Sequence, residues 1–246
     1  MNIELIKGKD IYKKAFKYII EKSQSNNLPY HNISHLVDVF NFSYKLCDVY
    51  NVREIFSEKH LEMVSIAALF HDMNHSGGKL SDGENIKLAI SSFESFMKEY
   101  DNKIDSEYLN FVKILISSTE FPHKDISEYN ISDIFVKIIR DSDMMSIRKN
   151  NSLYTTIFGL GDESGIDLRE QVNRQKKFLN NIDEYLYLDY SKEVCKKVKY
   201  KNISDVIFLD NILNKVNTYS KEEDTSEDKK MTAKEHLESI IGKSKN

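Results

Sequence analysis

The chain of 246 residues is poor in the residues that interrupt helices, with two prolines and eight glycines. Proline breaks a helix interior and glycine weakens it, so their scarcity favours helices joined by short loops. Apolar residues recur at spacings of three and four, and no convincing run alternates with the period of two that is typical of strands. The sequence therefore predicts an all-α fold, a compact helical bundle.

Cysteine and long apolar runs are also lacking. The two cysteines, Cys47 and Cys195, lie far apart in helical contexts, which excludes a disulfide framework and indicates a reducing compartment. No window approaches the roughly 20 apolar residues of a membrane-spanning helix, and residues 1–10 carry charge without the apolar core of a leader. We therefore expect a cytoplasmic protein with no membrane partner.

A strongly basic surface is the third absence. The formal net charge is −4, whereas proteins that bind polymeric nucleic acid present a basic surface to the phosphates. DNA and RNA are therefore poor candidates, and a small molecule is the expected partner.

Helical periodicity divides the chain into one domain and a tail. We expect a single catalytic domain over residues 1–219, followed by a charged linker and a C-terminal helix over residues 220–246. The expected helices lie at residues 9–23, from His31 onward, 57–72, 84–100, 106–118, 132–147, 167–187, 203–217 and 233–241.

Four histidines and an aspartate stand out in two short motifs. His31 and His35 are four residues apart, as are His71 and His75, so on a helix each pair would lie on one face. An apolar helix carries Asp72 toward the core, where an unpaired carboxylate is costly unless a cation meets it. Any one histidine alone could merely cap or pack. Together, and without cysteine, they predict a site for zinc, manganese, magnesium or iron, of the hydrolytic kind.

These motifs, in this order, carry a family resemblance. Tyr30-His31-Asn32-x-x-His35 resembles Tyr-His-Asn-x-x-His, and His71-Asp72-x-x-His75-x-Gly77 resembles His-Asp-x-x-His-x-Gly. Thr119-Glu120-Phe121-Pro122-His123 is similar, in a looser form, to Thr-Asp-x-x-x-His. The chain thus resembles the HD superfamily of metal-dependent phosphohydrolases, and most closely the class I 3′,5′-cyclic-nucleotide phosphodiesterase catalytic domain. The resemblance covers residues 28–187.

The resemblance implies two divalent metal ions. His35, His71, Asp72 and Asp143 would hold the first, a Zn²⁺ or a Mn²⁺ or Fe²⁺ ion, and Asp72 would bridge to the second, a Mg²⁺ or Mn²⁺ ion. Asp143 matches the distal ligand of the family, and Asp141 is the competing choice. A two-residue offset turns a helical side chain by roughly 200°, so only one of the two aspartates can face the metal.

The resemblance also implies roles in catalysis and substrate binding. His31 would be the general acid that protonates the departing O3′, and His75 would orient water. Gln175-Lys176-Lys177-Phe178-Leu179 resembles the Gln-x-x-Phe-Ile stretch whose glutamine and phenylalanine hold the base, and Tyr30 would line the same substrate site. Without the resemblance, Phe178 would be read as a core residue and Gln175 as a surface residue.

The chain departs from the family pattern at two places. The loop after His75 is short, and the family's downstream glutamate has no clear counterpart, which leaves Asp82 and Glu84 as candidates. Met145-Ser146 replaces the family's Ser-Asn after the distal aspartate.

The predicted function is metal-dependent hydrolysis of a 3′,5′-cyclic nucleotide, cAMP or cGMP or both, to the 5′-monophosphate by a hydroxide that bridges the metals. One alternative is another HD phosphohydrolase that acts on nucleoside mono- or triphosphates. A second is a non-catalytic nucleotide sensor, which His31 disfavours because a sensor needs no general acid. The absence of a Gly-Tyr-Pro signature disfavours cyclic dinucleotides.

Overall fold

Helices supply the regular structure of the chain. The computed structural model describes residues 10–100, 105–149 and 152–222, and no strand occurs within these ranges. The prediction of an all-α fold is therefore confirmed. Among the described residues, no helix is both long and apolar enough to cross a membrane.

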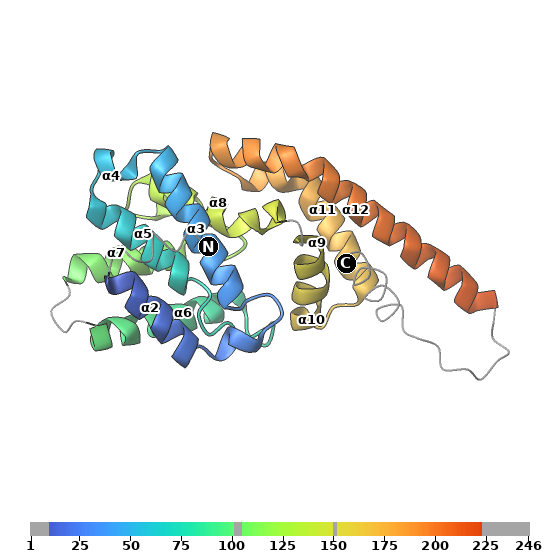
Figure 1. The fold of residues 1–246 in the computed structure, drawn as a ribbon, viewed down its shortest axis with the longest axis horizontal. Coiled ribbons are helices and arrows are strands. Elements are labelled where there is room, and N and C mark those ends of the chain that lie inside the picture. The colour runs from blue at the N-terminus through green and yellow to red at the C-terminus, as the bar shows by residue number, and fades with distance from the viewer. Residues whose placement is uncertain (1–9, 101–104, 150–151, 223–246) are drawn as a thin grey trace.

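The N-terminal part is a bundle built around α5. Its α-helices are α2 (Asp10–Lys22), α3 (Ile33–Val49), α4 (Val52–Ile55), α5 (Glu58–Phe70), α6 (Asp82–Tyr100), α7 (Ser106–Ser117) and α8 (Asp133–Met144), with short 3₁₀ turns η1 (Gln24–Asn27), η2 (Ile126–Glu128) and η3 (Met145–Arg148). Every residue from Met63 to Phe70 is buried. A helix that is apolar all round must be covered on all sides, and α5 packs against α3, α7 and α8 (Figure 1).

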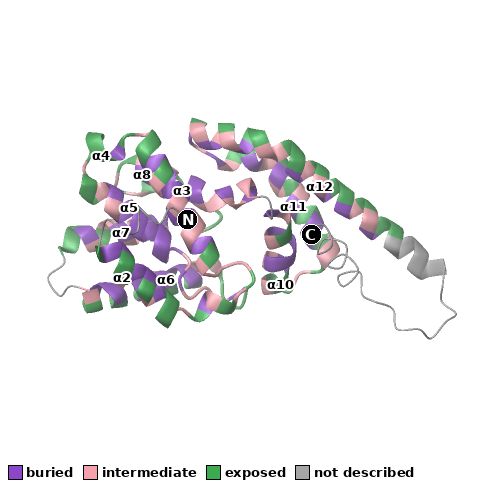
Figure 2. Ribbon diagram, viewed as in Figure 1, coloured by how far each residue is buried: buried purple, intermediate pink, exposed green. Residues whose placement is uncertain are grey.

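The C-terminal part is a second group of helices. A continuous helical stretch comprises α9 (Ser152–Tyr154), the π-helical turn η4 (Thr155–Gly159) and α10 (Leu160–Ser164). It is followed by α11 (Leu168–Tyr185) and by α12 (Asp189–Glu222), which packs along α11 and runs on beyond it (Figure 1). Buried residues concentrate in the bundle around α5, whereas much of α12 is exposed (Figure 2).

Besides the short helix α4, two longer helical segments were not predicted from the sequence. No helix was expected at residues 152–164, and α12 begins at Asp189 rather than at residue 203. The start of α12 is rich in lysine, which hides its apolar periodicity, although Cys195 lies fully buried on its inner face. Short or polar helices of this kind depend on tertiary packing more than on their own pattern.

The histidine motifs lie at helix ends rather than along helices. Asn32 caps α3, because its Oδ1 accepts a hydrogen bond from the Ser34 backbone N–H at 2.8 Å. His31 therefore precedes the helix that carries His35. At the other motif α5 ends at Phe70, with His71 as its C-cap and His75 beyond it. The prediction that each histidine pair shares one helical face is wrong, because the caps end the helices between the two members.

The boundary expected at residue 220 falls near the end of the described chain. α12 continues to Glu222, and Leu209 and Leu213 join it to the apolar core. The rest of the linker expected at 220–230 and the helix expected at 233–241 lie outside the described residues.

The cap on α3 gives a first testable prediction. Asn32→Ala removes the acceptor for Ser34 and the donor to the Leu28 carbonyl oxygen at 2.8 Å, and we expect a loss of about 0.5–2 kcal/mol in the free energy of unfolding. Asn32→Asp keeps the acceptor and should recover most of that loss. Denaturant unfolding measures both variants, and equal stability of the alanine variant and the original chain would contradict the role of the cap.

Candidate metal centre and substrate cavity

Four potential metal ligands converge from three helix ends. His35 lies in the first turn of α3, His71 and Asp72 follow α5, and Asp143 lies in the last turn of α8. One ligand atom from each of the four lies within 4.8 Å of the others. These are the four residues that the resemblance proposed as ligands.

The Nε2 atoms of both histidines point into this cluster. His35 Nε2 lies 3.1 Å from Asp72 Oδ2 and 3.2 Å from Asp143 Oδ1, and His71 Nε2 lies 3.1 Å from Asp72 Oδ2. On its other side, His71 Nδ1 donates to the Ala68 carbonyl oxygen at 2.9 Å. Because a carbonyl only accepts, Nδ1 carries a proton, and Nε2 is the nitrogen through which His71 can bind a metal.

The four groups perturb one another strongly. Burial alone would raise the pKa values of Asp72 and Asp143, but the imidazoles of His35 and His71 outweigh it and lower both. Burial likewise opposes protonation of the two histidines, yet the two carboxylates raise the pKa values of His35 and His71. A cation that enters must displace these imidazole protons, so its binding releases protons and strengthens as the pH rises.

The donor set fits a divalent cation. Two imidazoles and two carboxylates with no thiolate suit zinc, manganese or iron, and a carboxylate edge suits magnesium. Asp141 is not part of the set. Its carboxylate turns away and accepts the backbone N–H groups of Tyr187 and Leu188, each at 2.9 Å.

The other two histidines of the motifs form a second group. The rings of His31 and His75 are stacked with their centroids 3.7 Å apart. Burial, and then the neighbouring His31, lower the pKa of His75 to about 4, so its ring is neutral near pH 7. His75 pairs with the Gly77 backbone N–H and with the Asn85 side chain, each at 3.1 Å. The structure therefore places His75 behind His31 rather than in the ligand cluster.

Glu163 holds His31 in place. Its Oε2 lies 2.5 Å from His31 Nδ1, and its Oε1 accepts the backbone N–H groups of His31, at 2.8 Å, and of Tyr30. Burial would raise the pKa of Glu163, but these hydrogen bonds and the charge of His31 lower it. The other ring nitrogen of His31, Nε2, lies 4.0 Å from Asp72 Oδ2, beside the ligand cluster.

Two glycines allow this approach of α10 to the histidine loops. A Cβ on Gly78, whose φ is +77°, would lie 2.7 Å from the Glu163 carbonyl oxygen, and one on Gly159 would lie 3.1 Å from the Pro29 carbonyl oxygen. Larger residues would push the helix that carries Glu163 away from His31. Glu163 was missed in the sequence because 132 residues separate it from His31 and it lies outside every motif that was assigned.

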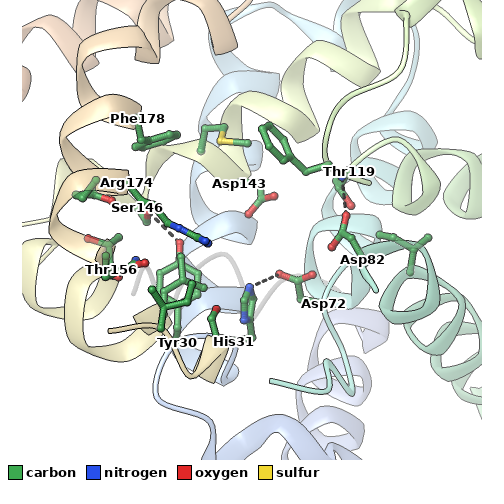
Figure 3. Close-up of a pocket in the computed structure, with 18 residues that line it drawn as sticks. Tyr30, His31, Asp72, Asp82, Thr119, Asp143, Ser146, Thr156, Arg174 and Phe178 are labelled. Carbon is green, nitrogen blue, oxygen red and sulfur yellow. Dashed lines mark hydrogen bonds and ion pairs between the residues drawn. The ribbon is translucent and has the colours of Figure 1, made fainter. Parts of the chain in front are cut away.

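A cavity of about 380 Å³ joins the ligand cluster to α11. Asp72, Asp143 and His31 line one part of it, and Phe178 of α11 lines another (Figure 3). Gln175 of α11 also lines the cavity. Tyr30 also lines the cavity, and its hydroxyl pairs with Ser146 Oγ at 3.2 Å. All three residues expected to bind substrate therefore border the same cavity as the candidate metal centre.

The two glutamines of α11 differ in how they are held. Gln171 Nε2 donates to the Thr156 carbonyl oxygen at 2.9 Å. Gln175 is also buried and lines the cavity, but within the described part of the chain no hydrogen bond to its amide is found. Phe178 stacks on Tyr185, with centroids 5.8 Å apart and planes 14° apart.

Asp82, rather than Glu84, reaches the cavity. Asp82 lines it at the start of α6, whereas the Glu84 carboxylate accepts from the Ser81 hydroxyl at 2.6 Å and faces solvent. Burial and the charges of Asp72 and Asp143 raise the pKa of Asp82, although the Phe121 N–H opposes the shift.

The His-Asp cluster beside a cavity resembles the site of a metal-dependent hydrolase. Residues 30–80 match the family described as 3′5′-cyclic nucleotide phosphodiesterase. The chain is therefore similar to class I cyclic-nucleotide phosphodiesterases, which confirms the resemblance and supports phosphodiesterase activity and divalent-metal use in general terms. No curated protein matches the chain.

The opposite orientations of the two aspartates on α8 give a second prediction. Asp143→Asn should weaken metal binding more than about tenfold, because it removes a charged ligand. Asp141→Asn should retain metal but lose about 1–3 kcal/mol of stability, because it weakens the hydrogen bonds to residues 187 and 188. Metal content by mass spectrometry and thermal unfolding separate the two effects. Loss of metal in the Asp141 variant alone would reverse the assignment.

Proposed function

We propose that the chain hydrolyses a 3′,5′-cyclic nucleotide, cAMP or cGMP or both, to the 5′-monophosphate. The observation that carries the proposal is that His31 lies beside the ligand cluster and lines the same cavity as Gln175 and Phe178. In the proposal His31 is the general acid, the ligand cluster holds the metal, and Gln175 and Phe178 contact the base. The catalytic unit we propose is residues 1–219.

Divalent ions held by His35, His71, Asp72 and Asp143, with Asp72 shared by a second ion, would activate water and neutralise charge on the phosphate. A Zn²⁺, Mn²⁺ or Fe²⁺ ion suits the histidine side, and Mg²⁺ or Mn²⁺ suits a second position dominated by carboxylate and water. The chain's own residues orient the substrate and move the proton.

His31 has the position of a general acid. Its Nδ1 is engaged by the Glu163 carboxylate, so Nε2 is the nitrogen that faces the cavity and the departing O3′. A carboxylate on one side of an imidazole fixes the orientation of the ring and leaves the opposite nitrogen to donate a proton. The neutral His75 ring supports His31 from behind.

The wall formed by α11 has the chemistry of a base site. The Gln175 amide offers both a donor and an acceptor to the edge of a purine. Phe178, one helical turn later, offers an aromatic face. A cavity of about 380 Å³ lies within the usual range for small-molecule sites.

Incubation with a panel of nucleotides tests the proposal. Purified protein with Mn²⁺ or Mg²⁺ should convert cyclic mononucleotides to 5′-monophosphates, and a chelator should abolish the reaction. Chromatography separates the products. Activity restricted to nucleoside mono- or triphosphates would transfer the assignment to another phosphohydrolase, and nucleotide binding without turnover would identify a sensor.

The role of His31 gives a separate prediction that depends on the leaving group. His31→Ala should lower kcat for a cyclic nucleotide by about 10²–10⁴-fold and should retain metal. It should affect bis(p-nitrophenyl) phosphate much less, because p-nitrophenolate departs without a proton. Glu163→Gln should also lower kcat for the cyclic nucleotide more than kcat for bis(p-nitrophenyl) phosphate.

Asp72→Ala is the matched control for His31→Ala. It removes a metal ligand and should abolish metal binding and turnover of both substrates. Equal losses for the two substrates in His31→Ala, with metal retained, would contradict the general-acid role.

A further inference from the structure

One residue of the Thr119–His123 segment lines the cavity without an assigned role. Phe121 lies in the loop between α7 and α8 and borders the cavity, yet 46% of its surface is exposed. Exposed phenylalanines elsewhere are Phe56, at 39%, and Phe208, at 65%, and neither lines this cavity. The distinctive feature of Phe121 is therefore its location at the substrate site.

The backbone of Phe121 is fixed by a second residue that lines the cavity. Its N–H donates to Asp82 Oδ2 at 2.5 Å, and Asp82 begins α6 and also lines the cavity. Just before it, the Ser118 carbonyl oxygen accepts from the buried Arg140 Nε at 2.7 Å. The loop is thus tied to α6 and to α8, which carries Asp143.

The ring of Phe121 is braced by other aromatic rings. It contacts His123, with centroids 5.4 Å apart, and Tyr185, with centroids 5.9 Å apart and planes 67° apart. Edge-to-face arrangements of this kind are favourable. The braced ring is held at the cavity rather than packed into the core.

Tyr185 connects Phe121 to the proposed base site. The same tyrosine stacks nearly parallel on Phe178, whereas Phe121 is steep to it. Phe121 and Phe178 therefore present two differently inclined aromatic walls to the cavity. One comes from the loop before α8 and the other from α11, and Tyr185 contacts both rings.

We propose that Phe121 contacts the base of the bound nucleotide and that, with Phe178, it favours a purine over the smaller pyrimidine. The inference rests on the proposed function, because it places the base beside α11 and the phosphate at the metal centre. The physical basis is contact of a planar base with an aromatic ring that water otherwise covers.

A tryptophan at position 121 provides a direct reporter. The chain has no tryptophan, so Phe121→Trp introduces a single indole at the cavity. With Mn²⁺ present, adenosine 5′-monophosphate should quench its emission in a saturable way, and inorganic phosphate should not. Phe56→Trp is the matched control, because Phe56 is partly exposed outside the cavity, and its emission should not respond to either ligand.

Binding affinities separate this inference from the proposed function. Calorimetry on Phe121→Ala should show adenosine 5′-monophosphate bound roughly 5- to 150-fold more weakly, with a smaller loss for cytidine 5′-monophosphate and no change for inorganic phosphate. Phe121→Leu should recover part of the loss for the purine. Phe56→Ala is the control and should bind all three ligands as the original chain does.

Unchanged affinity for the purine nucleotide, or a loss that extends equally to inorganic phosphate, would overturn the assignment of Phe121. The assignment would also be overturned if the original chain bound adenosine 5′-monophosphate no more tightly than inorganic phosphate. If Phe121→Ala behaves as expected while no cyclic nucleotide is hydrolysed, the contact with the base stands and the proposed reaction fails. If cyclic nucleotides are hydrolysed but Phe121→Ala leaves purine binding unchanged, the proposed reaction stands and the contact of Phe121 with the base fails.

Discussion

The structure depends on how two partly buried carboxylates, Asp72 and Asp143, are paired with the buried imidazoles of His35 and His71. The apolar helix α5 ends at Phe70 in the middle of the bundle, so the residues that follow it lie next to the core. Burial of unpaired charge is costly. The first turn of α3 supplies the imidazole of His35 and the end of α5 supplies that of His71, and a divalent cation would complete the neutralisation. The arrangement of α3, α5 and α8 is therefore inseparable from the chemistry of the site.

A second contact joins the C-terminal helices to this centre. Glu163 reaches from α10 to the ring of His31 and to two backbone N–H groups of its loop. Gly78 and Gly159 permit the close backbone approach that this contact requires. The same group of helices carries Gln175 and Phe178. One carboxylate thus fixes the orientation of the proposed acid and ties the C-terminal helices to the loop beside the ligand cluster.

The sequence indicated which residues belong to the candidate site better than it indicated how those residues are arranged. Residue types and spacing were sufficient to bring His35, His71 and Asp72 forward as candidates, and the resemblance added Asp143 and favoured it over Asp141. The helical assignment of both histidine pairs was wrong, because Asn32 and His71 are caps and a cap interrupts the 3.6-residue period. The two pairs divide: His35 and His71 face the ligand cluster, whereas His31 and His75 stack on each other.

What escaped prediction depends on contacts between distant parts of the chain. The stretch from α9 to α10 is short and partly π-helical, so no regular apolar period marks it. Glu163 lies on that stretch, and its importance comes only from its distance to His31. The early part of α12 is similar, because Lys196, Lys197 and Lys201 are exposed while Cys195 packs inward. Local patterns identify an amphipathic helix, but they do not identify its partners.

The difference between the two cavity glutamines bears on selectivity. Gln171 is fixed by the Thr156 carbonyl oxygen, so its amide presents one orientation. Gln175 has no such bond among the described residues, and an amide that can rotate offers either its donor or its acceptor. In the proposed function it would therefore accept the edges of both adenine and guanine. Discrimination between bases would then come from the shape of the cavity, where the inclined aromatic rings distinguish ligands by planar area rather than by hydrogen-bond pattern.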